Sequence, residues 1–174
     1  LLIQGVNGEV EIPPSVRMIG ARAFQGYSGL TRLVIPNSVT NIGFYAFAYY
    51  LGLADVTIPD DIQFVGEYAF GLCGRLANVT LPAYLIERSG PWSPYAGVVF
   101  AGTSIENVTM AEGITTIGSY AFAQGFEDET CPTHVTIPNS VTEICAYAFY
   151  NCPGLKSVTI PEGVTVIGDG SSPI

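Results

Sequence analysis

Hydrophobic residues recur along the chain with a period of about 23 positions. The apolar residues that end the predicted strands lie 23, 23, 23, 29, 27 and 23 positions apart. They are Ile12, Ile35, Ile58, Leu81, Met110, Ile137 and Ile160. In residues 53–58, Leu-Ala-Asp-Val-Thr-Ile, the first, fourth and sixth positions are apolar, which predicts a short strand with one buried face. A proline follows six of the seven residues and ends the strand, because proline cannot donate to a ladder. This period predicts a solenoid of stacked coils.

A second apolar segment and a Tyr-Ala-Phe motif complete the repeat. Residues 35–47, IPNSVTNIGFYAF, return as residues 137–149, IPNSVTEICAYAF, with weaker copies at 58–70 and 110–122. One phenylalanine per coil is expected to fill the interior beside a short helical turn, and these are Phe24, Phe47, Phe70, Phe100, Phe122 and Phe149. The sequence predicts one domain of about seven coils, near residues 12–34, 35–57, 58–80, 81–109, 110–136, 137–159 and 160–174.

The repeated pattern Ile-Pro-x-Ser-Val-Thr-x-Ile-Gly-x-Tyr-Ala-Phe-x-x-Cys-x-x-Leu-x-x-Val-Thr-Ile resembles the treponemal, or BspA-like, class of leucine-rich repeats. The resemblance covers residues 10–168. It implies a leucine-rich-repeat solenoid that is right-handed and curved, with a parallel β-sheet on the concave face and turns and helical segments on the convex side. It also implies an extracellular or cell-surface protein that adheres to host matrix or to other cells.

Charge and hydropathy limit the partners. The net charge is −9 and Lys156 is the single lysine, so the chain lacks the basic field that a nucleic acid or an anionic membrane would require. No apolar run approaches the roughly 18 residues of a membrane helix, so direct membrane insertion is not expected. Nearly half of the residues are apolar and 12% are charged, as expected for stacked coils that bury much of their length.

The predicted strands carry one outward column that varies from coil to coil. Its members are Arg32, Asp55, Asn78, Asn107 and His134, followed by Ser157. The neighbouring outward column starts with Val34 and is threonine in the later coils, as expected for β-branched residues on strands. We therefore expect specific recognition to use the varied column.

The fourth coil carries the largest departure from the period. About seven extra residues lie between Leu85 and Phe100, and they include Trp92 and Tyr95. Residues 89–95 are a candidate contact loop, and the alternative is that Trp92 folds back on the coil as a local plug.

Catalytic and metal sites are not expected. A triad would have to be built around His134, the single histidine. The residues from Cys131 to His134 have the spacing of half a zinc site, but no second pair follows. The acidic run at 127–129 lacks the alternating oxygen ligands of a calcium loop. We therefore expect no enzyme activity, no cofactor and no metal.

The four cysteines lead to separate expectations. Cys73 and Cys152 share one column three coils apart, about 14 Å at roughly 4.8 Å per coil, so they cannot bridge each other. Cys131 and Cys152 lie in adjacent coils near one corner and either bridge or stay reduced. Cys145 occupies the column that other coils fill with Gly20, Gly43, Gly66 and Gly118. We predict a negative φ throughout this column, with glycine kept for close packing.

These observations favour a non-catalytic binding module of a cell-surface protein. The expected ligand is a protein or a glycan bound through the concave face and the 89–95 loop, and the alternative is a passive spacer. The concave face measures about 430 Å² at the strand spacings above, whereas a stable protein interface takes about 800 Å² from each partner. A protein ligand would then also use flanking loops or further coils. Neither end shows a polar capping coil, which predicts a longer array or end-to-end contact between copies.

Overall fold

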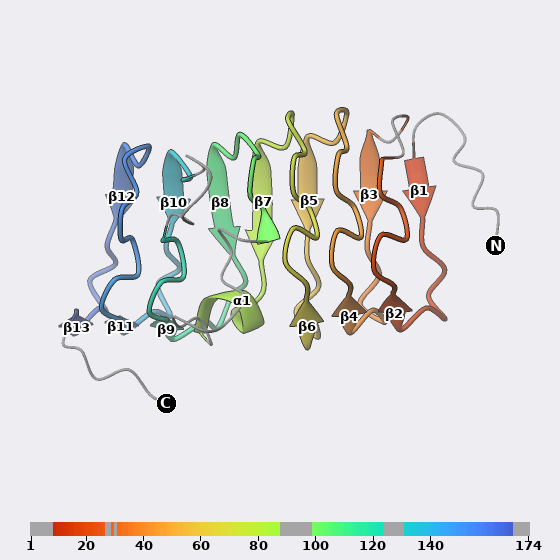
Figure 1. Cartoon of the computed structure of the whole chain (residues 1–174). Coiled ribbons are helices and arrows are strands. Elements are labelled where there is room, and N and C mark those ends of the chain that lie inside the picture. The colour runs from red at the N-terminus through yellow and green to blue at the C-terminus, as the bar shows by residue number, and fades with distance from the viewer. Residues whose placement is uncertain (1–8, 27–28, 30, 88–98, 124–130, 169–174) are drawn as a thin grey trace.

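The computed structural model describes residues 9–26, 29, 31–87, 99–123 and 131–168. With one exception, each coil passes through a long strand, a short strand and a turn segment before it reaches the next coil. Figure 1 shows the long strands side by side in one row and the short strands in a second row below them. The chain is therefore a solenoid of parallel strands, as its period predicts.

The long strands form the first row, which we call the long-strand face. They are β1 (Glu9–Glu11), β3 (Arg32–Val34), β5 (Asp55–Thr57), β7 (Asn78–Leu81), β8 (Asn107–Met110), β10 (His134–Thr136) and β12 (Ser157–Thr159). All of their pairings are parallel, in the order β1-β3 and β5-β7-β8-β10-β12. Parallel strands in sequence order are thus confirmed, with one interruption. Among the described residues no ladder joins β3 to β5, so the face consists of two sheets.

The short strands form the second row. They are β2 (Met18–Ile19), β4 (Asn41–Ile42), β6 (Phe64–Val65), β9 (Thr116–Ile117), β11 (Glu143–Ile144) and β13 (Val166–Ile167), paired in the orders β2-β4-β6 and β9-β11-β13. Helix α1 (Ala83–Glu87) takes the place of a short strand in the fourth coil. Its Ile86 carbonyl accepts a hydrogen bond from the Gly118 N–H at 2.8 Å, as the Ile42 carbonyl does from Gly66 in the coils before.

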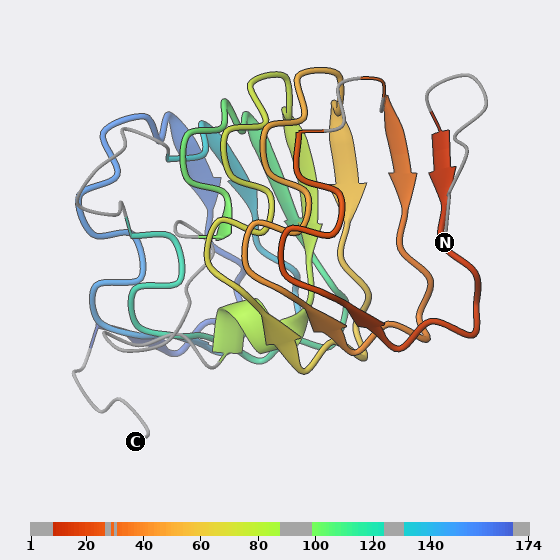
Figure 2. The ribbon, with the colours of Figure 1, turned by 45° about the vertical axis from the view of Figure 1, so that its right-hand side comes forward.

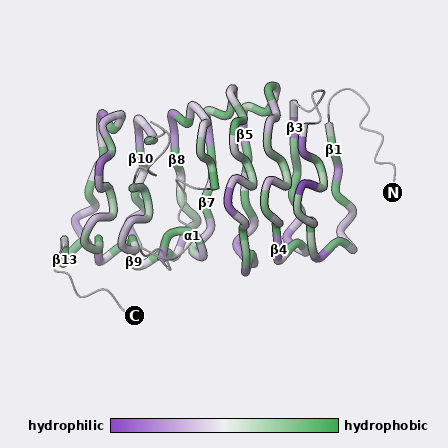
Figure 3. Tube along the Cα trace, viewed as in Figure 1, coloured by the Kyte–Doolittle hydropathy of each residue, from purple (hydrophilic) through white to green (hydrophobic). Residues whose placement is uncertain are grey.

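The interior is filled by the inward residues of both rows together with a column of phenylalanines. Apolar and polar residues alternate along the coils, as the colours of Figure 3 show. Ring centroids are 5.2 Å apart for Phe24 and Phe47, 5.3 Å for Phe47 and Phe70, and 5.4 Å for Phe70 and Phe100. A second stack joins Phe122 to Phe149 at 5.2 Å. The predicted phenylalanine column is therefore confirmed.

The turn segment differs from the helical turn expected at the Tyr-Ala-Phe motif. The motif forms consecutive β-turns, in which the Ala46 N–H donates to Gly43 and the Ala48 N–H donates to Tyr45, both at 3.2 Å. The backbone of its tyrosine is in the left-handed region, with φ values of 56°, 55°, 62° and 61° at Tyr45, Tyr68, Tyr120 and Tyr147. The expectation was wrong because backbone hydrogen bonds between coils determine the conformation of this segment. The Phe47 N–H, for example, donates to the Ala69 carbonyl of the next coil at 2.7 Å.

The recurring glycine is kept for close packing at two internal positions. Neither Gly43 nor Gly66 has a positive φ, and a Cβ added to Gly66 would lie 2.5 Å from the backbone nitrogen of Phe44. Cys145 does not have a positive φ either, which confirms the prediction for this residue. Gly20, Gly43, Gly66 and Gly118 likewise lack a positive φ, whereas Gly168 in the last described coil, which the prediction did not include, has a φ of +68°. The close packing of one coil on the next, rather than a left-handed backbone, therefore requires glycine at Gly43 and Gly66.

Candidate functional site

Three members of the varied column form a hydrogen-bonded row on the long-strand face, which we call the polar ladder. The Asn78 side-chain amide donates to the Asp55 carboxylate at 2.6 Å, and the Asn107 amide donates to the Asn78 carbonyl oxygen at 2.8 Å. The strand register then places His134 beside Asn107. The ring Nδ1 of His134 lies 2.9 Å from the Thr133 hydroxyl. The structure therefore brings these four candidates together in one exposed row.

Arg32, the fifth candidate on a strand, is separated from this row by a cleft. The cleft lies where β3 and β5 are not paired, and its volume is about 460 Å³. It is lined by Thr31, Arg32, Leu33, Val34 and Ile35 from one strand segment and by Asp55, Val56 and Thr57 from the other. Pockets for small ligands usually measure about 300–1,000 Å³, so the cleft is large enough for one.

Polar groups surround an apolar floor in the cleft. Arg32 and Asp55 are exposed on its two sides, while Leu33 and Val56 are buried beneath them. Val34, half of whose surface is exposed, takes the place that threonine occupies in the later coils. The cleft therefore offers one cationic side chain, one carboxylate and a small apolar surface within a single opening.

Backbone groups also point into the cleft. On the other side of β5, the Ala54 carbonyl accepts from Asn78, and the Ile58 N–H donates to Thr80. Backbone groups alternate in direction along a strand, so the N–H and C=O of Asp55 and Thr57 are directed toward β3. These groups can donate to or accept from a ligand that enters between the two strands.

The coils on either side of the cleft stay connected elsewhere. The short strands β4 and β6 pair across this step, and Phe47 and Phe70 stack inside it. In the turn segment the Tyr45 N–H donates to the Glu67 carbonyl at 3.2 Å. The opening is thus confined to the long-strand face.

Comparison with known protein families identifies the repeat. A family model described as BspA type leucine rich repeat region matches residues 7–125 and 123–171, in six copies. The chain belongs to the BspA-type leucine-rich repeat family. None of the curated proteins compared with it gives a significant match.

Solved structures of bacterial repeat proteins resemble this BspA-type chain. A leucine-rich repeat protein from Eubacterium ventriosum is 25% identical with a TM-score of 0.63, and the match covers 95% of this chain and 42% of that one. A leucine rich cell surface protein from Faecalibacterium prausnitzii is 25% identical with a TM-score of 0.44, covering 90% and 48%. The chain therefore spans less than half the length of these relatives.

The insertion of the fourth coil is attached away from the polar ladder. Trp92 and Tyr95 lie outside the described residues, so only its two anchors are placed. Glu87 ends α1 in the short-strand row, and its carboxylate accepts a hydrogen bond from the Thr115 N–H at 2.9 Å. The Val99 carbonyl accepts a hydrogen bond from the Phe70 N–H at 3.0 Å in the turn segment. The insertion is therefore anchored in the short-strand row and in the turn segment, whereas the polar ladder lies on the long-strand face.

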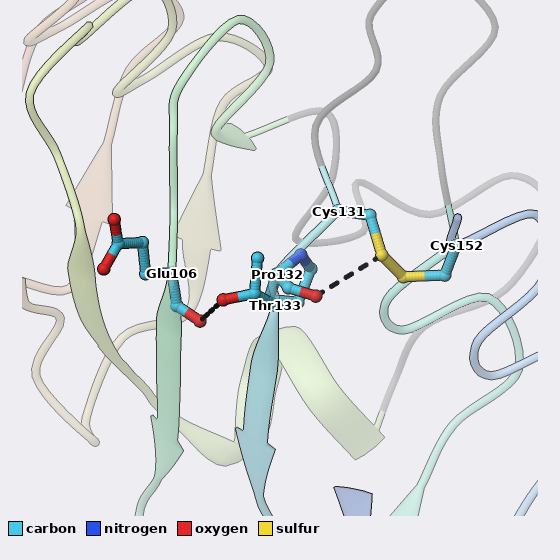
Figure 4. Close-up of a disulfide and its surroundings, with 5 residues drawn as sticks. All are labelled: Glu106, Cys131, Pro132, Thr133 and Cys152. Atoms are coloured by element: carbon cyan, nitrogen blue, oxygen red, sulfur yellow. Dashed lines mark hydrogen bonds between the residues drawn. A yellow bond between two sulfur atoms is a disulfide. The ribbon is translucent and has the colours of Figure 1, made fainter. Parts of the chain in front are cut away.

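A disulfide joins Cys131 to Cys152, with Cα atoms 5.4 Å apart, so this pair is oxidised. Figure 4 shows the bridge beside Thr133, whose hydroxyl donates to the Glu106 carbonyl at 2.9 Å. Because its sulfur is in a disulfide, Cys131 cannot act as the thiolate of half a zinc site with His134. Burial raises the pKa of the Cys73 thiol to about 11, despite an opposing backbone hydrogen bond from Tyr50. A thiol with this pKa is a packed side chain rather than a nucleophile.

The described residues contain neither a cluster of metal ligands nor a membrane-spanning helix. Within these ranges, no group of three or more His, Cys, Asp or Glu side chains is placed to hold a metal ion. Nor is any helix in the same ranges long and apolar enough to cross a membrane.

Sequence reasoning missed the cleft, although one signal was available. Val34 stands where the later coils have threonine, and it lies at the cleft. It also missed a row of stacked tyrosines on the turn segments. Tyr45 and Tyr68 stack at 5.1 Å, and Tyr120 and Tyr147 stack at 5.2 Å.

Proposed function

We propose that this chain is a non-catalytic binding module of an extracellular or cell-surface protein, and that it takes a protein or glycan ligand on its long-strand face. The cleft between β3 and β5 is the observation that carries this proposal. It combines the charged pair Arg32 and Asp55, outward backbone groups and an apolar floor. Ligand sites are typically concave, with a few polar groups that fix the orientation of the ligand.

The polar ladder positions a residue of the cleft and is not proposed as a second ligand site. Asn78 and Asn107 each use their amide to bond the neighbouring coil, which holds Asp55 in place from one side. A ligand that lies along the ladder would replace or share these bonds. A ligand in the cleft reaches Asp55 from the side that faces β3.

The cell-surface location is supported by the disulfide. Bridges such as Cys131–Cys152 persist in oxidising compartments and are rare in reducing ones. Membership of the BspA-type family agrees with this location.

The test is a binding screen on protein and glycan arrays with the chain and with a variant that lacks residues 89–95. We expect discrete binders whose affinity for the chain depends on Arg32 and Asp55. Loss of binding in the loop deletion would assign a second contact to the insertion. A chain that binds no array component would contradict the proposal.

A passive spacer is the second candidate function. It is favoured by the continuous internal stack from Phe24 to Phe100, which stiffens four coils. A spacer predicts that residues at the cleft can be replaced without any effect on attachment of cells that display the chain.

A further inference from the structure

The two charged side chains of the cleft lie on opposite sides of an apolar surface. Arg32 on β3 and Asp55 on β5 occupy the same outward column of successive coils, and both are exposed. Leu33 and Val56 form the buried floor below them, and Val34 is 50% exposed beside Arg32. Figure 1 labels the two strands as neighbours in the long-strand row, and the turned view of Figure 2 shows the same order. The cleft therefore has a cationic side, an anionic side and an apolar surface between them.

The carboxylate of Asp55 is held in place from the side away from β3. Its Oδ1 accepts the hydrogen bond from the Asn78 amide, whose own carbonyl oxygen accepts from Asn107. This bond leaves Oδ2 to accept from a ligand, because an ionised carboxylate has two acceptor oxygens. A side chain whose orientation is fixed in advance loses less conformational entropy when a ligand binds. Asp55 is therefore a preorganised partner for a cationic group.

The opposite charges of the cleft select against ligands that carry a single charge. An anion that is attracted by Arg32 is repelled by Asp55, and a cation that is attracted by Asp55 is repelled by Arg32. A ligand that carries both charges in the reverse order is attracted at both sides. The guanidinium group can bind a carboxylate through two parallel hydrogen bonds. The charges of the cleft therefore fit a ligand with a carboxylate at one end and an ammonium group at the other.

The apolar surface of the cleft favours a spacer between the two ligand charges. Paired strands lie about 4.8 Å apart, and β3 and β5 are neighbours that no ladder joins among the described residues. A spacer of several methylene groups reaches across this step and covers Val34, as lysine stems cover apolar surfaces elsewhere. In an α-amino acid both charged groups are attached to one carbon atom, so no such spacer lies between them. The cleft therefore fits an ω-amino carboxylate better than an α-amino acid.

We propose that the cleft binds an ω-amino carboxylate, and that a protein ligand presents this group as a C-terminal lysine. The terminal carboxylate binds Arg32, the lysine stem lies on Val34, and the ammonium group binds Asp55. An ammonium group has three donors, so it also bonds the Asp55 carbonyl oxygen, which is directed into the cleft. The inference rests on the proposed function, because it names the group that a protein ligand places in the same cleft.

The size of the long-strand face agrees with recognition of a chain end. A standard protein interface takes about 800 Å² from each partner, and this face is smaller. Capture of a terminal carboxylate is an established way to recognise a protein through a small contact. A C-terminal lysine therefore requires only the cleft, without the flanking coils that a larger protein surface would need.

The first test is an NMR titration of the chain with small probes that separate the two charges. 6-Aminohexanoic acid has both charges and a methylene spacer, hexanoic acid has only the carboxylate, and hexylamine has only the ammonium group. We expect 6-aminohexanoic acid to shift the amides of β3 and β5 with a dissociation constant on the order of 1 mM. Each single-charge probe, and glycine, which lacks the spacer, should bind at least ten-fold more weakly. Equal binding of a single-charge probe, or no shift of these amides by 6-aminohexanoic acid at about 20 mM, would overturn the inference.

Two substitutions test the assigned roles through charge preference. Asp55→Asn keeps the oxygen that accepts from Asn78 but removes the anion, so the preference for 6-aminohexanoic acid over hexanoic acid should fall to about two-fold or less. Arg32→Gln should reduce the preference over hexylamine in the same way. Asp60→Asn and Arg75→Gln, at exposed positions outside the cleft, are the matched controls and should leave both preferences unchanged. A loss of affinity for all probes without a change of preference would contradict the assigned roles.

Peptides test the protein source of the group. A peptide that ends in lysine with a free carboxylate should bind the chain, whereas the same peptide with a C-terminal amide, or with leucine as its last residue, should bind at least ten-fold more weakly. Equal binding of the three peptides would overturn the assignment to a C-terminal lysine. Array ligands that depend on Arg32 and Asp55 but not on a C-terminal lysine would contradict this inference and leave the proposed function intact.

Discussion

Two neighbouring junctions on the long-strand face are built from the same repeat, but the strands pair at only one of them. Between β5 and β7 the strands pair in parallel, and Asp55 is bonded to Asn78 by side chains as well. Between β3 and β5 no ladder joins the strands among the described residues, and a cleft opens instead. A coil is held to its neighbour on three sides, so it can open on one side without losing the other two.

The side chains of one outward column differ between the paired half of the face and the open junction. Further along the face, the Thr80 and Thr109 hydroxyls are 2.9 Å apart and bond each other across β7 and β8. At the open junction the corresponding column has Val34 beside Thr57, and valine has no hydroxyl with which to bond threonine. Side-chain bonds between coils thus accompany the paired half of the face and are absent from this column at the cleft.

The largest expected effect concerns the phenylalanine that connects the coils behind the cleft. Phe47→Ala removes a fully buried ring that stacks on both Phe24 and Phe70. We expect a loss of about 3–5 kcal/mol in the free energy of unfolding, measured by urea denaturation. Phe149→Ala is the control, because Phe149 is half-buried and distant from the cleft. An equal loss in both variants would show that Phe47 has no special role at the open junction.

Reduction of the disulfide is expected to have the next largest effect. The bridge closes a loop of 21 residues in sequence separation, which corresponds to about 3 kcal/mol from chain entropy. A Cys131→Ala and Cys152→Ala double variant should lose this amount in urea denaturation while hydrogen exchange at β3 and β5 stays unchanged. Faster exchange at those strands would show that the bridge and the cleft are coupled.

The sequence predicts the coils well because the residues that fill their interior recur with a regular period. Inward residues such as Ile42 and Val65, and the phenylalanine column, follow from a spacing that repeats. The cleft does not follow from the period, because it depends on whether two particular strands pair, and β3 has the same burial pattern as β5. The left-handed tyrosines were likewise missed, since hydrogen bonds between coils fix the backbone at Tyr45 and Tyr68.

Hydrogen exchange distinguishes the two junctions residue by residue. Thr57 and Thr80 share one column, but the Thr57 N–H is directed toward the cleft and the Thr80 N–H toward the paired strand β5. We expect exchange at Thr57 to be on the order of 100-fold faster than at Thr80, as for an amide outside a ladder. Equal protection measured by NMR would indicate that β3 and β5 pair in solution.

The smallest expected effect is in the polar ladder. Asn78→Ala removes both amide bonds of an exposed residue, and we expect a loss of about 0.5–1.5 kcal/mol in unfolding free energy. Ser157→Ala, in the same column of the last long strand, should change the unfolding free energy by less than about 0.5 kcal/mol. If the two variants are equally stable, the ladder does not strengthen the paired half.

Under the proposed function, ligands enter at the cleft rather than along the paired strands. The direct measurement compares Val34→Trp with Thr136→Trp, two exposed positions of one outward column, against the ligands found in the array screen. The indole at position 34 should fill the cleft and weaken binding at least ten-fold. The same side chain on β10 should leave the affinity within about two-fold. Both variants should have unfolding free energies within about 0.5 kcal/mol of the parent chain. Unchanged binding by Val34→Trp, or loss of binding by Thr136→Trp alone, would contradict the account.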